Sequence, residues 1–278
     1  MGPLTSPVEA IRRWITGSRG AAGSTLLAFL LAAGSVGLLV GLSSPSAGIG
    51  TPSPRLPASP VAAFQVPRPQ PLGSGPNLTL WAAVTSTTAA RSAPGLKSAS
   101  LISLSRLTPE RTSNLVLIVG RGRWRGGEEW LRVRLAALPA NETGWVPRRA
   151  LGAYEVVDTH LVVDRRSRKA TLYKEGRVIF RAPVGVGRAA SPTPAGQFYI
   201  RDRLAGFHKP FYGPVAFGTS ARSATLTEWP DGGFVGLHGT NRPRLIPGAV
   251  SHGCIRFTNA DIERLGALMP IGTPLTIR

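Results

Sequence analysis

The residues best suited to chemistry are a lone cysteine and the histidines near it. Cys254 is the only cysteine of the 278 residues, and two of the four histidines, His238 and His252, lie within sixteen positions of it. A thiol becomes a good nucleophile only as the thiolate, so it needs a nearby base or positive charge. Either histidine could serve: His252 is two residues away, and His238 precedes a loop that could return Cys254 opposite it across a sheet. Gly239 and Gly253 would let backbone N–H groups approach a developing oxyanion.

Other kinds of site fit these residues less well. Cys254, His238 and His252 could ligate zinc, but no second cysteine, His-x-x-x-His pair or acidic metal motif accompanies them. Ser251 as a nucleophile would lack the Gly-x-Ser-x-Gly elbow, and a thiol oxidoreductase would want a Cys-x-x-Cys pair. A small buried cysteine among structural histidines is the remaining alternative. Because two glycine-bearing histidine motifs converge on one thiol, we favour a Cys–His acyl transferase and expect no metal and no cofactor.

The same motifs resemble the signature of the YkuD-type L,D-transpeptidase catalytic domain. The Ser-His-Gly-Cys core is specific, and a proline–glycine segment upstream resembles the hairpin of the same family. The resemblance covers about residues 156 to 278. The matching residues are His238–Thr240, Ser251–Arg256, Asn259, Asp261, Pro270–Pro274 and, upstream, Ser191–Phe198.

The resemblance implies a bacterial cell-wall enzyme that acts on peptidoglycan stem peptides. Cys254 would attack a tetrapeptide stem and release D-alanine, with His238 as general base and then acid. The thioester would pass to the side-chain amine of another stem and form a 3→3 cross-link. The Gly239 carbonyl would hold the imidazole in its tautomer, and N–H groups around Gly253 and Cys254 would hold the oxyanion. Carbapenem-type β-lactams would acylate Cys254.

Three further motif residues are grouped as substrate-binding candidates. His252 would contact the substrate or support residues that do. Arg256 would pair with a substrate carboxylate or position its loop, with a surface ion pair as the alternative. Ser251 is better suited to shaping the turn than to reacting.

Two other functions stay open. An L,D-carboxypeptidase would hydrolyse the same thioester with water, and nothing in the sequence marks an acceptor site. A non-catalytic wall-binding protein would use a binding barrel and a purely structural second domain, although the intact His238 and Cys254 argue against it.

The elements that must position these residues read as strands. Period-two alternation predicts antiparallel hairpins in the second half of the chain, and a short helix begins at Asn259 as its N-cap, with Ile262, Leu265 and Leu268 on one face. Arg201–Trp229 is interpreted as a lid or pocket wall, or else a plain connecting loop. The expected strands are His160–Asp164, Lys169–Tyr173, Arg177–Val184, Gln197–Ile200 and residues 272–277.

Upstream strands and turns over residues 77–154 resemble a bacterial SH3-like barrel, most clearly at Trp130–Val133 and Gly144–Pro147. The predicted fold class is therefore mainly β. A small SH3-like barrel precedes a β-rich L,D-transpeptidase domain at 155–278 with one or two short helices, and an N-terminal transmembrane helix completes the chain.

The N-terminal region predicts export. Residues 21–42 carry no charge and would span about 33 Å as a helix, enough to cross a bilayer. Three arginines precede them, so residues 1–20 are expected to form a cytoplasmic tail, with the catalytic domain outside the cell membrane. A cleaved signal peptide, with secretion to the wall, is the alternative. Residues 43–76 contain nine prolines and no acidic residue, as expected of an extended linker.

The formal charge of +19, from 33 basic and 14 acidic residues, suits an anionic partner. Nucleic acid, a membrane face and an acidic wall polymer all qualify. Because no nucleic-acid motif accompanies scattered arginines, we do not expect a nucleic-acid partner.

Overall fold

The computed structural model describes residues 77–124, 127–205, 210–225 and 233–278, all within the unit Gln65–Arg278. The predicted cytoplasmic tail, the membrane segment at 21–42 and the proline-rich linker at 43–76 lie outside these described residues. Within the described ranges, no helix combines the length and apolar character needed to cross a bilayer.

The first half of the described chain is a seven-stranded antiparallel sheet, ordered β3-β2-β6-β5-β4-β1-β7. Both places where the SH3-like resemblance is clearest, Trp130–Val133 and Gly144–Pro147, lie in strands. The predicted domain boundary at 154 falls inside the last strand, which stays paired with the first as far as Val157. The SH3-like resemblance stays a prediction. The strands are β1 (Thr79–Val84), β2 (Thr88–Arg91), β3 (Ser100–Leu104), β4 (Leu115–Arg123), β5 (Glu129–Arg134), β6 (Thr143–Pro147) and β7 (Leu151–Val157).

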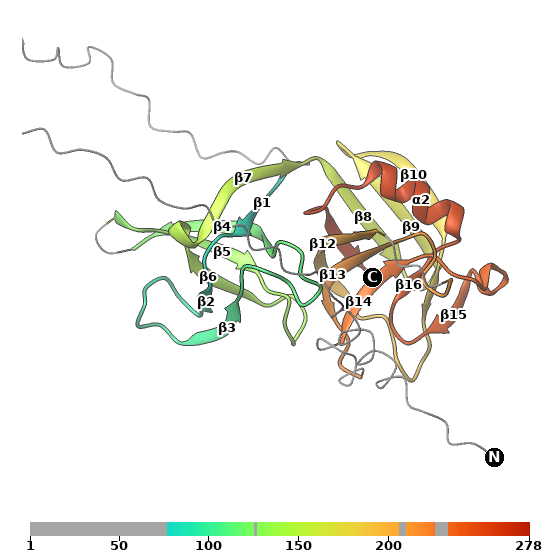
Figure 1. The fold of residues 1–278 in the computed structure, drawn as a ribbon, viewed down its shortest axis with the longest axis horizontal. Coiled ribbons are helices and arrows are strands. Elements are labelled where there is room, and N and C mark those ends of the chain that lie inside the picture. The colour runs from blue at the N-terminus through green and yellow to red at the C-terminus, as the bar shows by residue number, and fades with distance from the viewer. Residues whose placement is uncertain (1–76, 125–126, 206–209, 226–232) are drawn as a thin grey trace, which may run out of the picture. The chain divides into compact units, whose positions relative to one another are not determined.

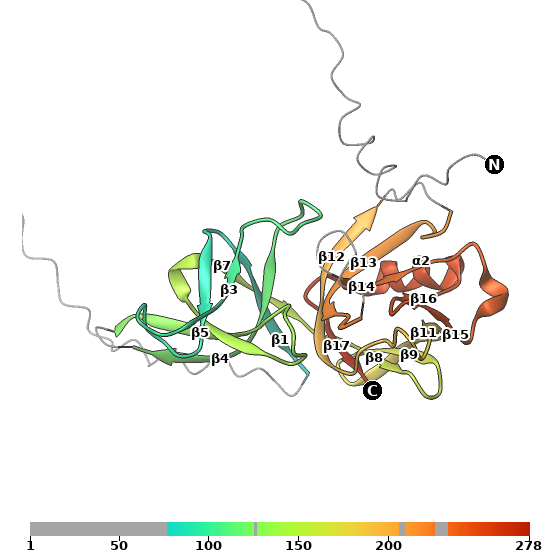
Figure 2. The same cartoon turned by 90° about the horizontal axis from the view of Figure 1, so that it is seen from below.

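The second half is a ten-stranded mixed sheet, ordered β10-β9-β8-β17-β12-β13-β14-β16-β11-β15. The predicted hairpins are confirmed as β8–β9 and β9–β10. Figures 1 and 2 show these strands around the one α-helix of the described residues, so the mainly-β class is confirmed. The strands are β8 (Thr159–Asp164), β9 (Lys169–Lys174), β10 (Arg177–Pro183), β11 (Gly185–Gly187), β12 (Gly196–Ala205), β13 (Val215–Arg222), β14 (Phe234–His238), β15 (Gly248–Ser251), β16 (Ile255–Arg256) and β17 (Pro274–Ile277).

The segment predicted as a lid contains regular structure instead. Arg201 begins the second half of β12, and Val215–Arg222 is the buried strand β13, in which Phe217 is a core residue. Both faces of β13 are buried, so its sequence lacks the alternation that reveals a half-exposed strand. Among the described residues of this segment, 210–214, which directly precede β13, stay candidates for a pocket wall.

The helix α2 (Asn259–Leu268) packs against β13 and β14 through Ile262 and Leu265. Leu268, predicted to share that face, is 40% exposed, and Met269 is buried instead. At about 100° per residue, a position seven residues after Ile262 returns to its face, whereas one six residues after it does not. The prediction was therefore wrong by one residue.

The N-cap of α2 is Thr258 rather than the predicted Asn259. The Thr258 hydroxyl accepts a hydrogen bond from the Asp261 amide at 3.1 Å and donates to the Asp261 carboxylate at 2.7 Å. The cap thus satisfies one of the amides that a helix start leaves without a partner, and the acidic side chain suits the positive end of the helix dipole. The side chain of Asn259 is free to bond elsewhere.

We expect Thr258→Ala to lower the free energy of unfolding by about 1 kcal/mol, because the Asp261 amide loses its side-chain acceptor. Denaturant unfolding followed by circular dichroism measures this change. Unchanged stability would contradict the cap assignment.

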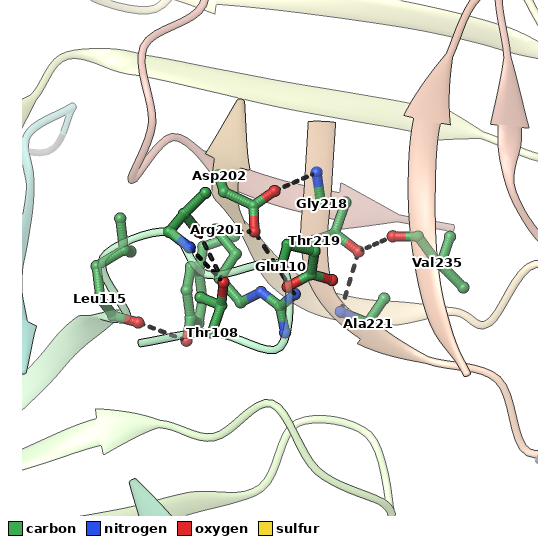
Figure 3. Close-up of polar contacts among 11 residues, drawn as sticks. Thr108, Glu110, Leu115, Arg201, Asp202, Gly218, Thr219, Ala221 and Val235 are labelled. Carbon is green, nitrogen blue, oxygen red and sulfur yellow. Dashed lines mark hydrogen bonds and ion pairs between the residues drawn. The ribbon is translucent and has the colours of Figure 1, made fainter. Parts of the chain in front are cut away.

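A buried charged cluster lies where the strand β12 contacts the loop between β3 and β4. Figure 3 shows the Arg201 guanidinium paired with Glu110 at 2.5 Å and close to Asp202 at 3.5 Å. Asp202 also accepts from the Thr112 hydroxyl at 3.4 Å. Burial raises the pKa of Asp202, an effect that the Arg201 charge opposes. Polar contacts of the buried Arg201 and Asp202 with the partly exposed Glu110 and Thr112 therefore join the two sheets.

Asp202 also forms a hydrogen bond to the strand β13, which pairs with the strand that carries His238. Its carboxylate accepts from the Gly218 amide at 2.9 Å (Figure 3). A Cβ at Gly218 would lie 2.3 Å from that carboxylate, so the close approach requires glycine. Gly218 pairs with Gly236 of β14, so the Asp202 hydrogen bond supports the strand next to the one that carries His238.

Candidate active site

The parallel pairing of β14 with β16 decides on which face of the sheet the two predicted catalytic residues lie. Leu237 pairs with Ile255 in the core, and His238 pairs with Arg256. Because side chains alternate along a strand, His238 and Arg256 share the face opposite that core. Continuing this register by one residue places Cys254 opposite Gly236, diagonal to His238 on the same face. As expected, the loop after His238 brings Cys254 back beside the strand β14. The cysteine lies opposite Gly236, two residues before His238, rather than opposite His238 itself.

Gly236 gives the thiol a hydrogen-bond donor that the sequence did not suggest. Its amide donates to Cys254 Sγ at 3.4 Å, and a Cβ at this position would lie 4.0 Å from the same sulfur. Burial raises the pKa of the Cys254 thiol, whereas the Gly236 amide and the Arg256 charge act to lower it. Cys254 is half-buried. The site therefore holds a thiol that needs a base to become a nucleophile.

His238 is 2% exposed, and its Nδ1 lies 2.6 Å from the Gly239 carbonyl oxygen. Since a carbonyl can only accept, Nδ1 carries the proton and Nε2 is left with a lone pair. Burial lowers the pKa of His238 to about 4, opposed by the Gly239 carbonyl and helped by the Arg256 charge. The imidazole is thus neutral at neutral pH, in the tautomer that can accept a proton at Nε2.

Two aromatic side chains of residues 210–214 form a wall beside the imidazole. The Tyr212 ring meets His238 edge-on at 4.9 Å between centroids, and the Phe211 ring lies 6.1 Å away. Tyr212 is also close enough to Cys254 and Arg256 for their charges to affect its pKa, which burial raises. These two aromatics therefore lie beside the imidazole, and their role as a pocket wall stays a prediction. Phe207 and Trp229 lie outside the described residues.

Arg256 places a buried positive charge at the site. Its guanidinium carbon lies 4.7 Å from the Phe211 ring centre, and its Nε has no hydrogen-bond partner among the described residues. Arg242 and Arg188 are near enough to lower its pKa further, beyond the larger effect of burial. None of these three arginines joins an ion pair between described residues. Between described residues, Arg256 therefore does not form the surface ion pair considered for it.

Ser251 belongs to the turn rather than to a substrate-facing surface. It is fully buried, donates from Oγ to the Cys254 carbonyl at 2.6 Å and accepts from the Gly253 amide at 3.1 Å. Its grouping with the substrate-binding residues is corrected accordingly, because a side chain held by its own turn cannot reach a substrate. The Gly253 amide is also engaged, which leaves the Cys254 amide as the candidate oxyanion donor of this turn.

Thr193 holds the other side of the turn. Its hydroxyl accepts from the Gly187 amide at 2.8 Å and donates to the Gly253 carbonyl at 2.7 Å. Gly253 itself has φ of 121°, a conformation that favours glycine. The proline–glycine segment that resembles the family hairpin therefore supports the cysteine turn directly.

His252 is exposed, and the Arg188 guanidinium donates to its Nε2. The side chain lies outside the ladder that carries His238 and Cys254. Of the two candidate bases, only His238 is buried and oriented by a carbonyl. Within the described ranges, no three His, Cys, Asp or Glu side chains gather as a metal site would need.

We expect kcat/KM to stay level around neutral pH and to fall as the pH drops through about 4. His238 can accept a proton only in its neutral form, which prevails above its lowered pKa of about 4. Because the Cys254 pKa is raised, the rate should not follow thiolate formation near neutrality. Initial rates between pH 3 and pH 8 on stem peptides, with circular dichroism to monitor folding, measure this. An acid limb near 6.5, the ordinary histidine value, would contradict a buried base.

Comparisons with known proteins identify the family of this domain. Residues 158–277 match the family of L,D-transpeptidase catalytic domains named YkuD. YkuD of Bacillus subtilis, described as a candidate L,D-transpeptidase, is 36% identical over 118 residues, which are 42% of this chain and 65% of the relative. Its namesake in Bacillus licheniformis is 32% identical over 123 residues, 44% of this chain and 67% of the relative.

Among solved structures, the catalytic domain of an Enterococcus faecium L,D-transpeptidase acylated by ertapenem is 24% identical, with a TM-score of 0.33. The match covers 44% of this chain and 98% of that one. The chain spans less than two thirds of the B. subtilis relative. Through residues 158–277, the chain belongs to the YkuD family of L,D-transpeptidase catalytic domains.

Proposed function

We propose that this protein is a cysteine-dependent L,D-transpeptidase that forms 3→3 cross-links between peptidoglycan stem peptides. The observation that carries the proposal is that the register of β14 and β16 puts Cys254 on the same sheet face as a buried His238 whose imidazole is oriented by a backbone carbonyl. A nucleophile and a base oriented by a third group are the minimum for acyl transfer.

In the first half-reaction, the Cys254 thiol gives its proton to Nε2 of His238, and the sulfur attacks the carbonyl of the diamino acid, which is joined to D-alanine. The S–C bond forms, and the oxyanion is held by the Cys254 amide. The C–N bond then breaks, and His238 returns the proton to the departing D-alanine amine. A thioester stays on Cys254.

In the second half-reaction, the side-chain amine of another stem attacks the thioester. His238 takes a proton from that amine, because an ammonium group is no nucleophile. The new amide bond forms as the S–C bond breaks, and the proton returns to the sulfur. Gly236 supports the sulfur as a leaving group through its amide.

Substrate recognition is assigned to the positive charge around the thiol. Arg256, with Arg242 and Arg188 nearby, lacks a carboxylate partner among the described residues and suits a free carboxylate of the stem. His252, exposed beside Arg188, would border the same surface. A carbapenem-type β-lactam carries both a reactive carbonyl and a carboxylate, so it would acylate Cys254.

The location of the enzyme is part of the proposal. An uncharged segment at 21–42, preceded by arginines, supports a single membrane anchor with the catalytic domain outside the cytoplasm, tethered by residues 43–76. Secretion after signal cleavage is the alternative outcome. Protease accessibility of the catalytic domain in intact cells, with mass determination of the mature N-terminus, separates the two.

Mass spectrometry of the full chain incubated in detergent with tetrapeptide stems tests the activity. A cross-linked dimer with loss of D-alanine supports transpeptidation. Trimmed tripeptide alone would identify a carboxypeptidase, in which water takes the acyl group. Untouched stems together with binding to isolated cell walls would identify a non-catalytic wall-binding protein and overturn the proposal.

A further inference from the structure

The peptide unit that orients His238 is held from its other side by Asn259. The Gly239 carbonyl and the Thr240 amide belong to one planar group, and in a trans peptide they point in opposite directions. The carbonyl lies against His238 Nδ1, whereas the amide donates to Asn259 Oδ1 at 2.9 Å. The Asn259 side chain on the helix α2 therefore fixes the plane of the Gly239–Thr240 peptide, and the carbonyl of that peptide orients the His238 imidazole.

Close packing shows that this junction is built around Asn259. A Cβ at Gly239 would lie 2.3 Å from Asn259 Oδ1, and a Cβ at Gly213 would lie 2.5 Å from the same atom. The Gly213 and Gly239 backbones also touch, since a Cβ at Gly213 would be 2.8 Å from the Gly239 Cα. Gly213 directly follows Tyr212, whose ring lies against His238. The asparagine oxygen thus contacts both the strand end that carries the base and the wall beside it.

A peptide bond that follows a glycine needs a hydrogen-bond partner to hold its orientation. Without a Cβ, Gly239 has many backbone conformations available, so rotation of the Gly239–Thr240 peptide is inexpensive. A rotated peptide would point the Thr240 amide, a donor, toward His238 Nδ1. Nδ1 would then have to accept, and the proton would move to Nε2. An imidazole in that tautomer cannot take a proton from Cys254.

We propose that Asn259 is a positioning residue that selects the reactive tautomer of His238 by holding the Gly239–Thr240 peptide in one orientation. This inference rests on the proposed function, because the tautomer matters only if His238 is the base. Asn259 acts through the peptide and does not touch the reacting atoms.

None of the charged or titratable described groups that face His238 orients its imidazole, so the Gly239–Thr240 peptide has this role. Arg256 of β16 acts on His238 through its charge, and the Tyr212 ring of the wall contacts the imidazole. Cys254 of the turn before β16 is close enough to Tyr212 for its charge to affect the pKa of that tyrosine. Among the described residues, the partner of His238 Nδ1 is a backbone carbonyl and not a carboxylate as in a Ser-His-Asp triad. The direction of that carbonyl depends on Asn259.

Asn259→Ala in the full chain tests the proposal. Long-range ¹H–¹⁵N spectra of the imidazole near pH 7 should show only the Nδ1–H tautomer in the parent protein and a mixture with the Nε2–H tautomer in the variant. The turnover number should fall about tenfold to a hundredfold, because misplaced catalytic groups cost that much, while KM changes little.

Asn259→Asp is the conservative rescue. Its carboxylate still accepts from the Thr240 amide, so the Nδ1–H tautomer and most of the turnover should return. The added negative charge favours the imidazolium, so the acid limb of the pH profile should move to higher pH.

Thr258→Ala is the matched control, because it weakens the start of the same helix without removing the bond to Thr240. It should lower stability and leave the tautomer and the pH profile unchanged. A single tautomer and unchanged turnover in Asn259→Ala would overturn the inference, as would equal effects of both alanine variants. The tautomer is measured without substrate, so loss of this inference is distinguishable from failure of the proposed function, which Cys254→Ala tests.

Discussion

Cys254→Ala is expected to abolish both cross-linking and acylation by a carbapenem. The variant removes the one thiol of the chain, and no neighbouring group can form the thioester in its place. Loss of a covalent nucleophile lowers the turnover number by at least about 10⁴-fold. Intact-protein mass spectrometry should show the inhibitor adduct on the parent protein and none on the variant.

Cys254→Ser is the matched control for geometry. A serine oxygen can still accept from the Gly236 amide, so the turn should keep its structure, yet a hydroxyl is a far weaker nucleophile beside a neutral imidazole. Thermal unfolding should be nearly unchanged in both variants, and binding to isolated cell walls should survive. Cross-linking that persists in the alanine variant would defeat the enzyme proposal.

His238→Asn is expected to lower kcat by about 10²- to 10⁴-fold, the usual contribution of a general base. The asparagine amide can still donate to the Gly239 carbonyl from nearly the position of Nδ1, so the orienting contact survives while the base is lost. The acid limb near pH 4 should disappear. Residual activity should rise with pH through the raised pKa of Cys254, because the reaction then requires a preformed thiolate.

His252→Asn separates the two motif histidines. His252 is exposed and contacts Arg188, so its loss should raise KM for stem peptides and leave the acid limb where it is. A pH profile that loses its acid limb in His252→Asn, but keeps it in His238→Asn, would reverse the assignment of the base.

The strands that show one face to water could be predicted from sequence. In β8, β9 and β10, buried and more exposed residues largely alternate, and the hairpins were found where the period-two pattern put them. The strand β13 was missed because seven of its eight residues are buried, which leaves no alternation to detect. A fully buried strand and a buried loop of similar composition look alike in a sequence.

At the site, the residue types predicted thiol chemistry. The hydrogen-bond partners of those residues, however, depend on the pairing register of the strands and could not be predicted. Ser251 was grouped with substrate contacts, whereas its hydroxyl closes the turn that carries Cys254. The sequence did not predict three contacts at the site, because their partners are 18 to 60 residues apart in the chain. These are the contacts made by Gly236, Thr193 and Asn259. A glycine two residues before a motif histidine could have suggested that the strand leaves room for a partner.

The sequence by itself determined the chemistry available to this protein: one thiol, two histidines with adjacent glycines, and alternating strands to carry them. Only the tertiary structure decided which histidine shares a sheet face with the sulfur and which nitrogen of that ring keeps a lone pair. The physical reason is that residue identity is local, whereas hydrogen-bond direction is set by the pairing of strands and by a helix that arrives from elsewhere in the chain.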